Sequence, residues 1–114
     1  MPEDALDELK LLDREALMEK MAAELPEIRT ALKVTQEALA EKTGVDAAKI
    51  KACENGRRSL KWSEYMSILF VIWNNDIGRG ILESKELFPE ALKKALSVNR
   101  NAHAPQTAAG RYGL

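Results

Sequence analysis

The polar segment at residues 55–58, with the sequence NGRR, has the chemistry of a phosphate ligand, and Lys61 follows it closely. Backbone N–H groups and guanidinium groups in such a turn are the donors that hold phosphate oxygens in nucleic-acid complexes. Thr35 and Gln36 provide a second set, because Thr35 is a suitable N-cap for a helix beginning at Gln36 and a helix N-terminus attracts anions. These residues predict a surface that binds phosphate.

Catalytic chemistry finds little support in the residue types. Cys53 could act as a nucleophile with His103 as its base. Cys53, however, lies three residues after Ile50 on an apolar stripe, where a cysteine is usually a small buried hydrophobe. One cysteine and one histidine cannot form a structural zinc site. We therefore expect no enzyme activity, no metal site and no cofactor.

Two short helices joined by a turn are predicted to position these polar residues. Gly44 ends the first helix, because a helix commonly ends at a glycine in the left-handed conformation. Asp46 is a suitable N-cap for the second helix. A small shared core is predicted for Ala40, Val45, Ile50 and Cys53.

The spacing of these residues is similar to that of a known family. TQEALA at 35–40, GV at 44–45, Ile50 and ENGRR at 54–58 resemble the lambda-repressor/Cro-like (XRE) family of bacterial and phage regulators. The match extends over about residues 25–75, and it is specific because many positions recur together. The resemblance implies an all-α fold, a lambda-repressor-like helix-turn-helix bundle with an extra N-terminal helix and one or two C-terminal helices. It also implies a transcriptional regulator that binds double-stranded DNA.

The resemblance further implies residue roles. The helix at 46–55 would lie in the major groove, and Gln36 would contact the DNA backbone. Arg29 would pair with Glu54 and so tie the first helix of the domain to the end of the recognition helix. Bases would be contacted from the positions that Ala47, Ala48, Lys49 and Ala52 hold here.

The predicted reading face is poor in hydrogen-bonding side chains, since alanine can only touch a thymine methyl group or let the backbone come close. Lys49 is therefore the candidate for contacting a guanine edge, and Lys51 is a candidate for a backbone contact. Affinity is expected to come mostly from phosphate contacts and to fall steeply with salt. The predicted DNA-binding residues are Thr35, Gln36, Ala47, Ala48, Lys49, Lys51, Ala52, Asn55, Arg57, Arg58 and Lys61.

The whole chain is predicted to contain four regions. Residues 1–24 form one amphipathic helix, and Pro26, tolerated at a helix start, begins the next at 27–33. The helix-turn-helix domain covers 25–75, C-terminal helices cover 76–98, and a disordered tail covers 99–114. The main core helix is predicted at 62–75, and its inward face consists of Trp62, Met66, Leu69, Phe70 and Trp73.

Composition and charge are typical of a soluble domain that binds an anion. The 114 residues are 46% hydrophobic and 31% charged. Residues 1–27 carry nine acidic and three basic side chains, whereas residues 28–62 carry eight basic and four acidic ones.

The longest apolar run, at 68–73, is too short to span a membrane, and the acidic N-terminus does not resemble a signal peptide. We expect a cytoplasmic protein without membrane contact.

A homodimer is expected, because one such module contacts one half-site of a two-fold symmetric sequence. Its interface is predicted at either the apolar stripe of residues 6–21 or the helices at 77–98; the N-terminal helix could instead be a lid on its own domain. Two alternative functions stay open. The protein could be the antitoxin of a toxin–antitoxin pair, or a protein-interaction module on the same fold without specific DNA binding.

Overall fold

The computed structural model describes residues 13–97 of the chain. Predictions for residues 1–12 and 98–114, among them the disordered tail and His103, lie outside the described residues. The described part is entirely α-helical, without a strand, so the predicted fold class is confirmed. Its helices are α2 (Arg14–Leu32), α3 (Gln36–Thr43), α4 (Ala47–Glu54), α5 (Trp62–Trp73), α6 (Asp76–Ser84) and α7 (Glu90–Leu96).

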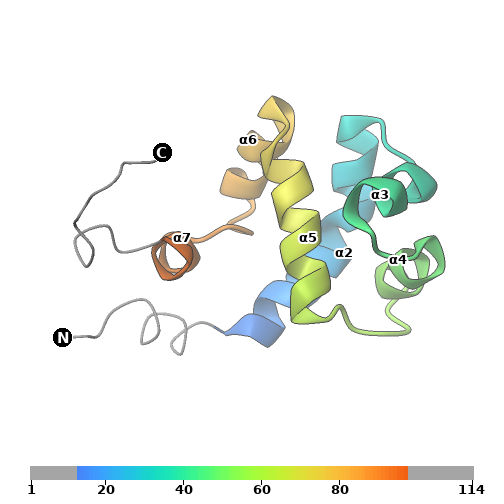
Figure 1. Ribbon diagram of the computed structural model, residues 1–114, viewed down its shortest axis with the longest axis horizontal. Coiled ribbons are helices and arrows are strands. Elements are labelled where there is room, and N and C mark those ends of the chain that lie inside the picture. The colour runs from blue at the N-terminus through green and yellow to red at the C-terminus, as the bar shows by residue number, and fades with distance from the viewer. Residues whose placement is uncertain (1–12, 98–114) are drawn as a thin grey trace, which may run out of the picture.

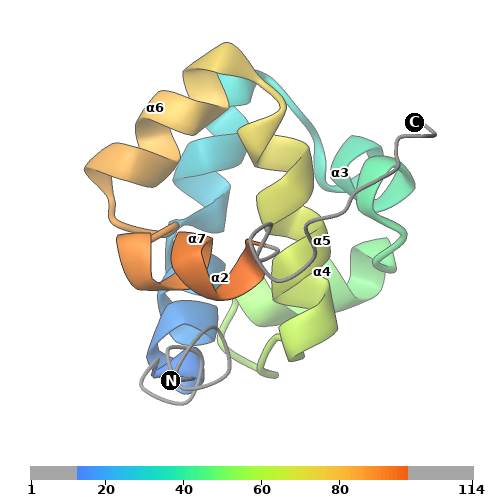
Figure 2. The same cartoon turned by 60° about the vertical axis from the view of Figure 1, so that its left-hand side comes forward.

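α5 lies at the centre of the bundle (Figure 1). The pair α3 and α4 lies on one side of α5, and α6 and α7 lie on the other (Figure 2). α2 contacts α4, α5 and α6, so it joins the two sides. Within residues 13–97, no helix is both long and apolar enough to cross a lipid bilayer.

α2 is one continuous helix through Pro26, so the predicted division into separate helices at 1–24 and 27–33 is wrong. A proline inside a helix removes one hydrogen bond and costs about 3 kcal/mol. Met21, Leu25 and Ile28 lie on both sides of Pro26 at helical spacing, and each is at most 1% exposed. Burying each such side chain contributes about 1.5–3 kcal/mol, which outweighs the loss at Pro26.

The described part of the predicted N-terminal helix covers its own domain. Leu17 and Met18 pack against the core, and Met21 and Ala22 belong to it. From Arg14 onward, this segment therefore acts as the lid considered above. The leucines at 6, 9 and 12 lie outside the described residues.

α5 is the main core helix, as predicted, but the predicted inward face is wrong in part. Leu69 is buried, whereas Phe70 is 69% exposed. The other three predicted residues are only partly buried, namely Trp62, Met66 and Trp73. The helix is apolar on most sides, so its periodicity does not fix which side faces inward. On the side that faces inward, the Tyr65 hydroxyl donates a hydrogen bond to the Leu87 carbonyl oxygen, and burial raises the pKa of Tyr65. The buried stripe consists of Tyr65, Ile68, Leu69 and Ile72.

α6 packs closely against the end of α5. A Cβ atom at Gly78 would lie 2.3 Å from the Ile72 carbonyl oxygen, so only glycine allows this approach. Asn75 is the N-cap of α6, and its Oδ1 accepts a hydrogen bond from the Gly78 N–H at 2.9 Å. α7 begins after Pro89 and is linked to α6 by the Lys93–Glu83 ion pair at 2.8 Å.

Lys33 ends α2 in the left-handed conformation, with φ of 59° and ψ of 46°. The Lys33 N–H donates to the Thr30 carbonyl at 3.2 Å, and the Val34 N–H donates to the Arg29 carbonyl at 2.9 Å. These two bonds form a Schellman motif, in which glycine is the preferred left-handed residue. A lysine there is strained, because its Cβ crowds the following carbonyl oxygen.

Replacing Lys33 with glycine should relieve this strain. We expect Lys33→Gly to raise the free energy of unfolding by about 0.5–1 kcal/mol, measured by urea denaturation. Lys42→Gly is the matched control, since Lys42 lies inside α3 and the same change should lower stability by about 0.5–1 kcal/mol. Equal losses in both variants would show that Lys33 is not strained.

Candidate nucleic-acid interface

α3 begins and ends as predicted. The Thr35 hydroxyl oxygen accepts a hydrogen bond from the Ala38 N–H at 3.0 Å, which makes Thr35 the N-cap. Gly44 has φ of 80°, and its N–H donates to the Ala40 carbonyl at 2.8 Å. The chain can therefore turn directly from α3 towards α4.

Thr43 holds the turn together from within. Its hydroxyl donates to the Leu39 carbonyl at 2.8 Å and accepts from the Val45 N–H at 3.1 Å. Val45, Ile50 and Cys53 are buried, so the predicted small core between the two helices is confirmed. Asp46 occupies the predicted N-cap position of α4, but its side chain makes no capping hydrogen bond.

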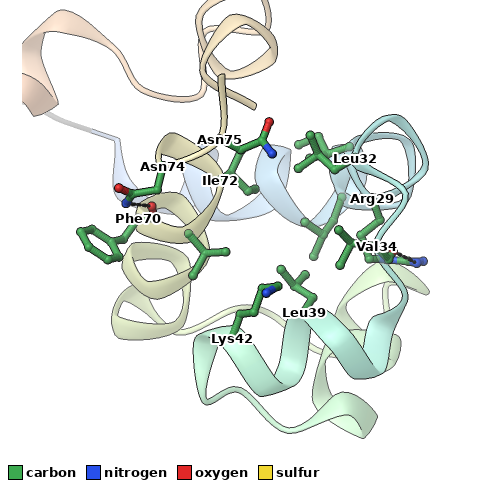
Figure 3. A pocket seen from close by; sticks show the side chains of 12 residues that line it. Arg29, Leu32, Val34, Leu39, Lys42, Phe70, Ile72, Asn74 and Asn75 are labelled. Carbon is green, nitrogen blue, oxygen red and sulfur yellow. Dashed lines mark hydrogen bonds between the residues drawn. The ribbon is translucent and has the colours of Figure 1, made fainter. Parts of the chain in front are cut away.

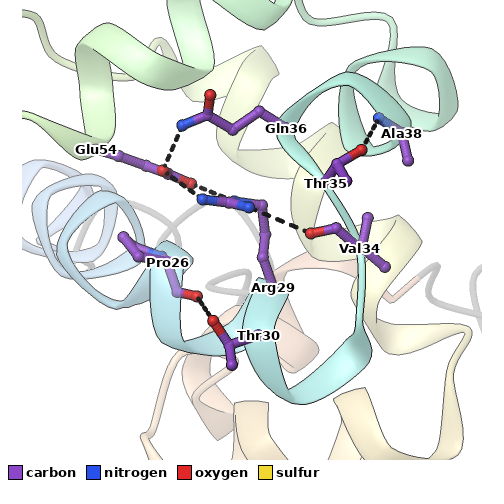
Figure 4. Close-up of polar contacts among 8 residues, drawn as sticks. All are labelled: Pro26, Arg29, Thr30, Val34, Thr35, Gln36, Ala38 and Glu54. Carbon is purple, nitrogen blue, oxygen red and sulfur yellow. Dashed lines mark hydrogen bonds and ion pairs between the residues drawn. The ribbon is translucent and has the colours of Figure 1, made fainter.

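The Glu54 carboxylate joins three helices at one point (Figure 4). Arg29 of α2 donates to it from Nε at 2.7 Å and from NH2 at 2.9 Å, as the sequence predicts. Gln36, the first residue of α3, donates from Nε2 at 2.8 Å. Arg29 also donates from NH1 to the Val34 carbonyl at 3.2 Å, which ties the α2–α3 connection to the same group.

This cluster is largely shielded from water, with the Glu54 side chain 4% exposed and the Arg29 side chain 19% exposed. The hydrogen bonds to Glu54 raise the pKa of Arg29, although burial acts in the opposite direction. A buried carboxylate is costly unless its oxygens are bonded, so α2, α3 and α4 are held in one relative arrangement.

α4 ends in a second Schellman motif at Gly56, whose φ is 77°. The Gly56 N–H donates to the Cys53 carbonyl at 3.1 Å, and the Arg57 N–H donates to the Ala52 carbonyl at 2.8 Å. The N–H groups of Gly56 and Arg57 are therefore already used within the fold, which leaves the side chains of this turn as its main candidate phosphate donors. The Arg57 side chain is exposed and projects from a fixed turn.

Arg58 and Lys61 are both connected to Glu64. Glu64 Oε1 accepts from Arg58 NH1 at 3.1 Å and from the Lys61 N–H at 2.9 Å. Burial acts to raise the pKa of Glu64, but these two hydrogen bonds and nearby positive charge outweigh it and lower the pKa. The bond to Glu64 in turn raises the pKa of Arg58. The Arg58 guanidinium is thus partly neutralised within the fold.

The outward face of α4 is small and basic. Ala48, Lys49 and Lys51 are exposed, and Ala47 and Ala52 are partly exposed. Asn55, Arg57 and Lys61 are exposed beyond its end. Within residues 13–97, the side chains of Lys49, Lys51, Arg57 and Lys61 form no hydrogen bond or ion pair, so their charges face solvent.

Residues 20–69 match the family model described as a helix-turn-helix domain. The chain contains a helix-turn-helix domain. The match covers α3, the turn at Gly44 and α4, together with most of α2 and α5. It agrees with the resemblance that residues 35–58 carry. No curated protein and no solved structure is significantly similar to the chain.

Two residues of the helix-turn-helix domain have roles that the sequence interpretation missed. Glu64 holds Arg58 and caps α5, and its place three residues after the N-cap Lys61 is the signal, since Glu is favoured there. Gln36 supplies the third side-chain hydrogen bond to Glu54, whereas the resemblance implies only a DNA contact for it. Buried carboxylates need several donors, so a polar residue near a predicted Arg–Glu pair is the signal for Gln36.

Removing Arg29 should leave the Glu54 carboxylate with one of its three side-chain donors. We expect Arg29→Ala to lower the free energy of unfolding by roughly 2–4 kcal/mol, measured by urea denaturation. The double variant with Glu54→Gln should recover part of this loss, because no buried charge then lacks its partner. The exposed Arg57→Ala is the control and should change stability by at most about 0.5 kcal/mol. A loss in Arg29→Ala no larger than in this control would contradict the role of the cluster.

Glu64 should make folding sensitive to acid. Because its pKa in the folded state is lowered from 4.5, ionised Glu64 stabilises the fold above that pH. This contribution should disappear as the pH falls below 4.5 and through the lowered pKa. Thermal unfolding of the wild type and Glu64→Gln should therefore differ most at neutral pH and converge in acid. A difference that grows towards low pH would contradict the direction of the shift.

Proposed function

We propose that this protein is a transcriptional regulator of the XRE type that binds duplex DNA with α4 in the major groove. The observation that carries the proposal is the exposed, small and basic outer face of α4 within a helix-turn-helix domain. The major groove of B-DNA is about 12 Å wide and admits one α-helix. The Glu54 cluster supports this role, since it fixes how far α4 stands out from α2 and α3.

Base contacts come from few side chains in this proposal. Ala47, Ala48 and Ala52 let the backbone of α4 approach the base edges and can touch thymine methyl groups. Lys49 is exposed near the start of α4 and can donate to a guanine edge. Sequence preference is therefore modest, and one base pair dominates it.

Phosphate contacts supply most of the affinity in this proposal. Arg57 and Lys61 are the leading candidates, because their charged groups face solvent. Arg58 and Gln36 contribute less than their sequence positions suggest, since Glu64 and Glu54 already bind them. Thr35, Lys51 and Asn55 are exposed nearby and complete the predicted set.

A protein-interaction module is the second candidate function, and the three alanines on the outer face of α4 favour it. These alanine positions have no side chain that can form hydrogen bonds with bases, so they cannot distinguish many base pairs. In this case the same exposed face would contact another protein, and duplex DNA would bind weakly or not at all.

Selection of bound sequences from random duplex DNA, followed by titrations at several salt concentrations, tests the proposal. We expect one enriched half-site and a steep fall in affinity with salt. Arg57→Ala should weaken binding to all sequences alike and reduce the salt slope by about one. Lys49→Ala should instead relax the preference at one base pair, for about 1–3 kcal/mol.

Lys20→Ala is the matched control, because Lys20 is also exposed but lies on α2 outside the proposed interface. It should leave the selected sequence and the salt slope unchanged. Absence of duplex binding at low salt would reject the regulator and favour the interaction module.

A further inference from the structure

An apolar groove opens between α2, α3 and α5 (Figure 3). Its volume is about 380 Å³, at the small end of the range of about 300–1,000 Å³ that is usual for pockets that hold small molecules. No residue of α4 lines it, so an occupant would leave the proposed reading face accessible. Its apolar lining includes Leu25, Ile28, Leu32, Val34, Leu39 and Val71.

The apolar walls of the groove are aliphatic. Phe70 lies at its edge, but the ring points away from it and is 69% exposed (Figure 3). The lining therefore offers no aromatic face on which a planar ring could stack. Aliphatic side chains instead suit a flexible alkyl chain, because the hydrophobic effect does not depend on direction.

The polar residues of the groove differ in whether their groups are already bonded. The Arg29 guanidinium is bound by Glu54, and the side chains of Asn74 and Asn75 form hydrogen bonds with nearby backbone groups. Within residues 13–97, the Lys42 side chain forms no hydrogen bond or ion pair. It is directed towards the space that the lining residues surround (Figure 3). The groove thus combines an aliphatic surface with one positive charge that faces no carboxylate.

We propose that this groove binds an aliphatic carboxylate, with the alkyl chain against the apolar lining and the carboxylate beside Lys42 Nζ. An ammonium group and a carboxylate form a charge-assisted hydrogen bond, which is about twice as strong as a neutral one. A water molecule occupies about 30 Å³ in the liquid, and a methylene group is of similar size, so the groove holds roughly ten non-hydrogen atoms. Octanoate has this size.

Other classes of occupant fit these features less well. A peptide brings backbone N–H and C=O groups that need partners, whereas most polar groups of the lining are already bonded within the fold. A cationic amphiphile would meet a like charge at Lys42. The proposal does not rest on DNA binding, because none of the predicted DNA-binding residues lines the groove.

Titration of the ¹⁵N-labelled protein with octanoate, followed by NMR, tests the location of the site. We expect saturable shifts at Leu32, Val34, Lys42 and Val71, with a dissociation constant of about 1 mM or below for a ligand of this size. Leu96 is 44% exposed on α7, outside the groove, and its signal should stay in place. Equal shifts at Leu96 would show adsorption to any exposed apolar surface and would overturn the proposal.

Ligands with the same alkyl chain and a different head group test the role of charge. Octylammonium reverses the charge of octanoate, and octan-1-ol removes it. We expect octanoate to bind at least about 5-fold more tightly than octylammonium, with octan-1-ol between them. The net charge of the chain is only −1, so the protein as a whole does not favour an anion. Equal affinity for octanoate and octylammonium would overturn the proposal.

The variant Lys42→Gln tests the residue itself. It removes the charge but keeps most of the stem, so we expect about 3- to 10-fold weaker octanoate binding and unchanged octan-1-ol binding. Lys20→Gln is the matched control, because it changes the net charge equally and Lys20 lies on α2 outside the groove. Circular dichroism should show that both variants stay folded, since both lysines are exposed. Equal octanoate affinity of the wild type and both variants would overturn the proposal.

A dilution series of the protein without ligand tests whether a second copy fills the groove instead. We expect the signals of Val34, Lys42 and Val71 to be independent of protein concentration. Shifts of these signals with concentration would place a second copy in the groove and would overturn the proposal.

Discussion

The arrangement of this helix-turn-helix domain depends on one buried carboxylate. Glu54 at the end of α4 accepts hydrogen bonds from Arg29 of α2 and Gln36 of α3, so a single group fixes three helices. Each of α3 and α4 has only eight residues, so the apolar surface that either helix can bury is limited. Apolar packing tolerates small shifts, whereas a buried charge with directional bonds does not. The carboxylate therefore supplies orientation that such short helices could not maintain alone.

The basic residues of the domain fall into two groups with different tasks. Arg29 and Arg58 face carboxylates and are part of the framework. Lys49, Lys51, Arg57 and Lys61 face solvent and produce the external positive field. Counting positive charge along residues 28–62 therefore overestimates what is available to an anionic partner. A basic side chain is available to an anionic partner only where no carboxylate of the fold already binds it.

The helix-turn-helix itself could be predicted from the sequence because its determinants are local. Gly44, Val45 and Ile50 have roles that follow from backbone conformation and helical spacing within a few residues. The continuity of α2 at Pro26 and the exposure of Phe70 could not be predicted from the sequence, because tertiary packing decides both. Burial on both sides of Pro26 keeps α2 intact, and the inward face of α5 is the one that buries Tyr65 with its hydrogen bond to Leu87. The Tyr65–Leu87 contact joins residues 22 positions apart, so it leaves no signal in the sequence around Phe70.

The turn at Gly56 has a kinetic consequence. Its backbone is already fixed by hydrogen bonds to the last turn of α4, so Arg57 does not need an ordering step before it meets a partner. Binding that requires no loop folding avoids an entropic cost and a slow conformational step. Association with an anionic partner should then be limited by diffusion and steered by charge, while the lifetime of the complex is set by how quickly the few contacts break.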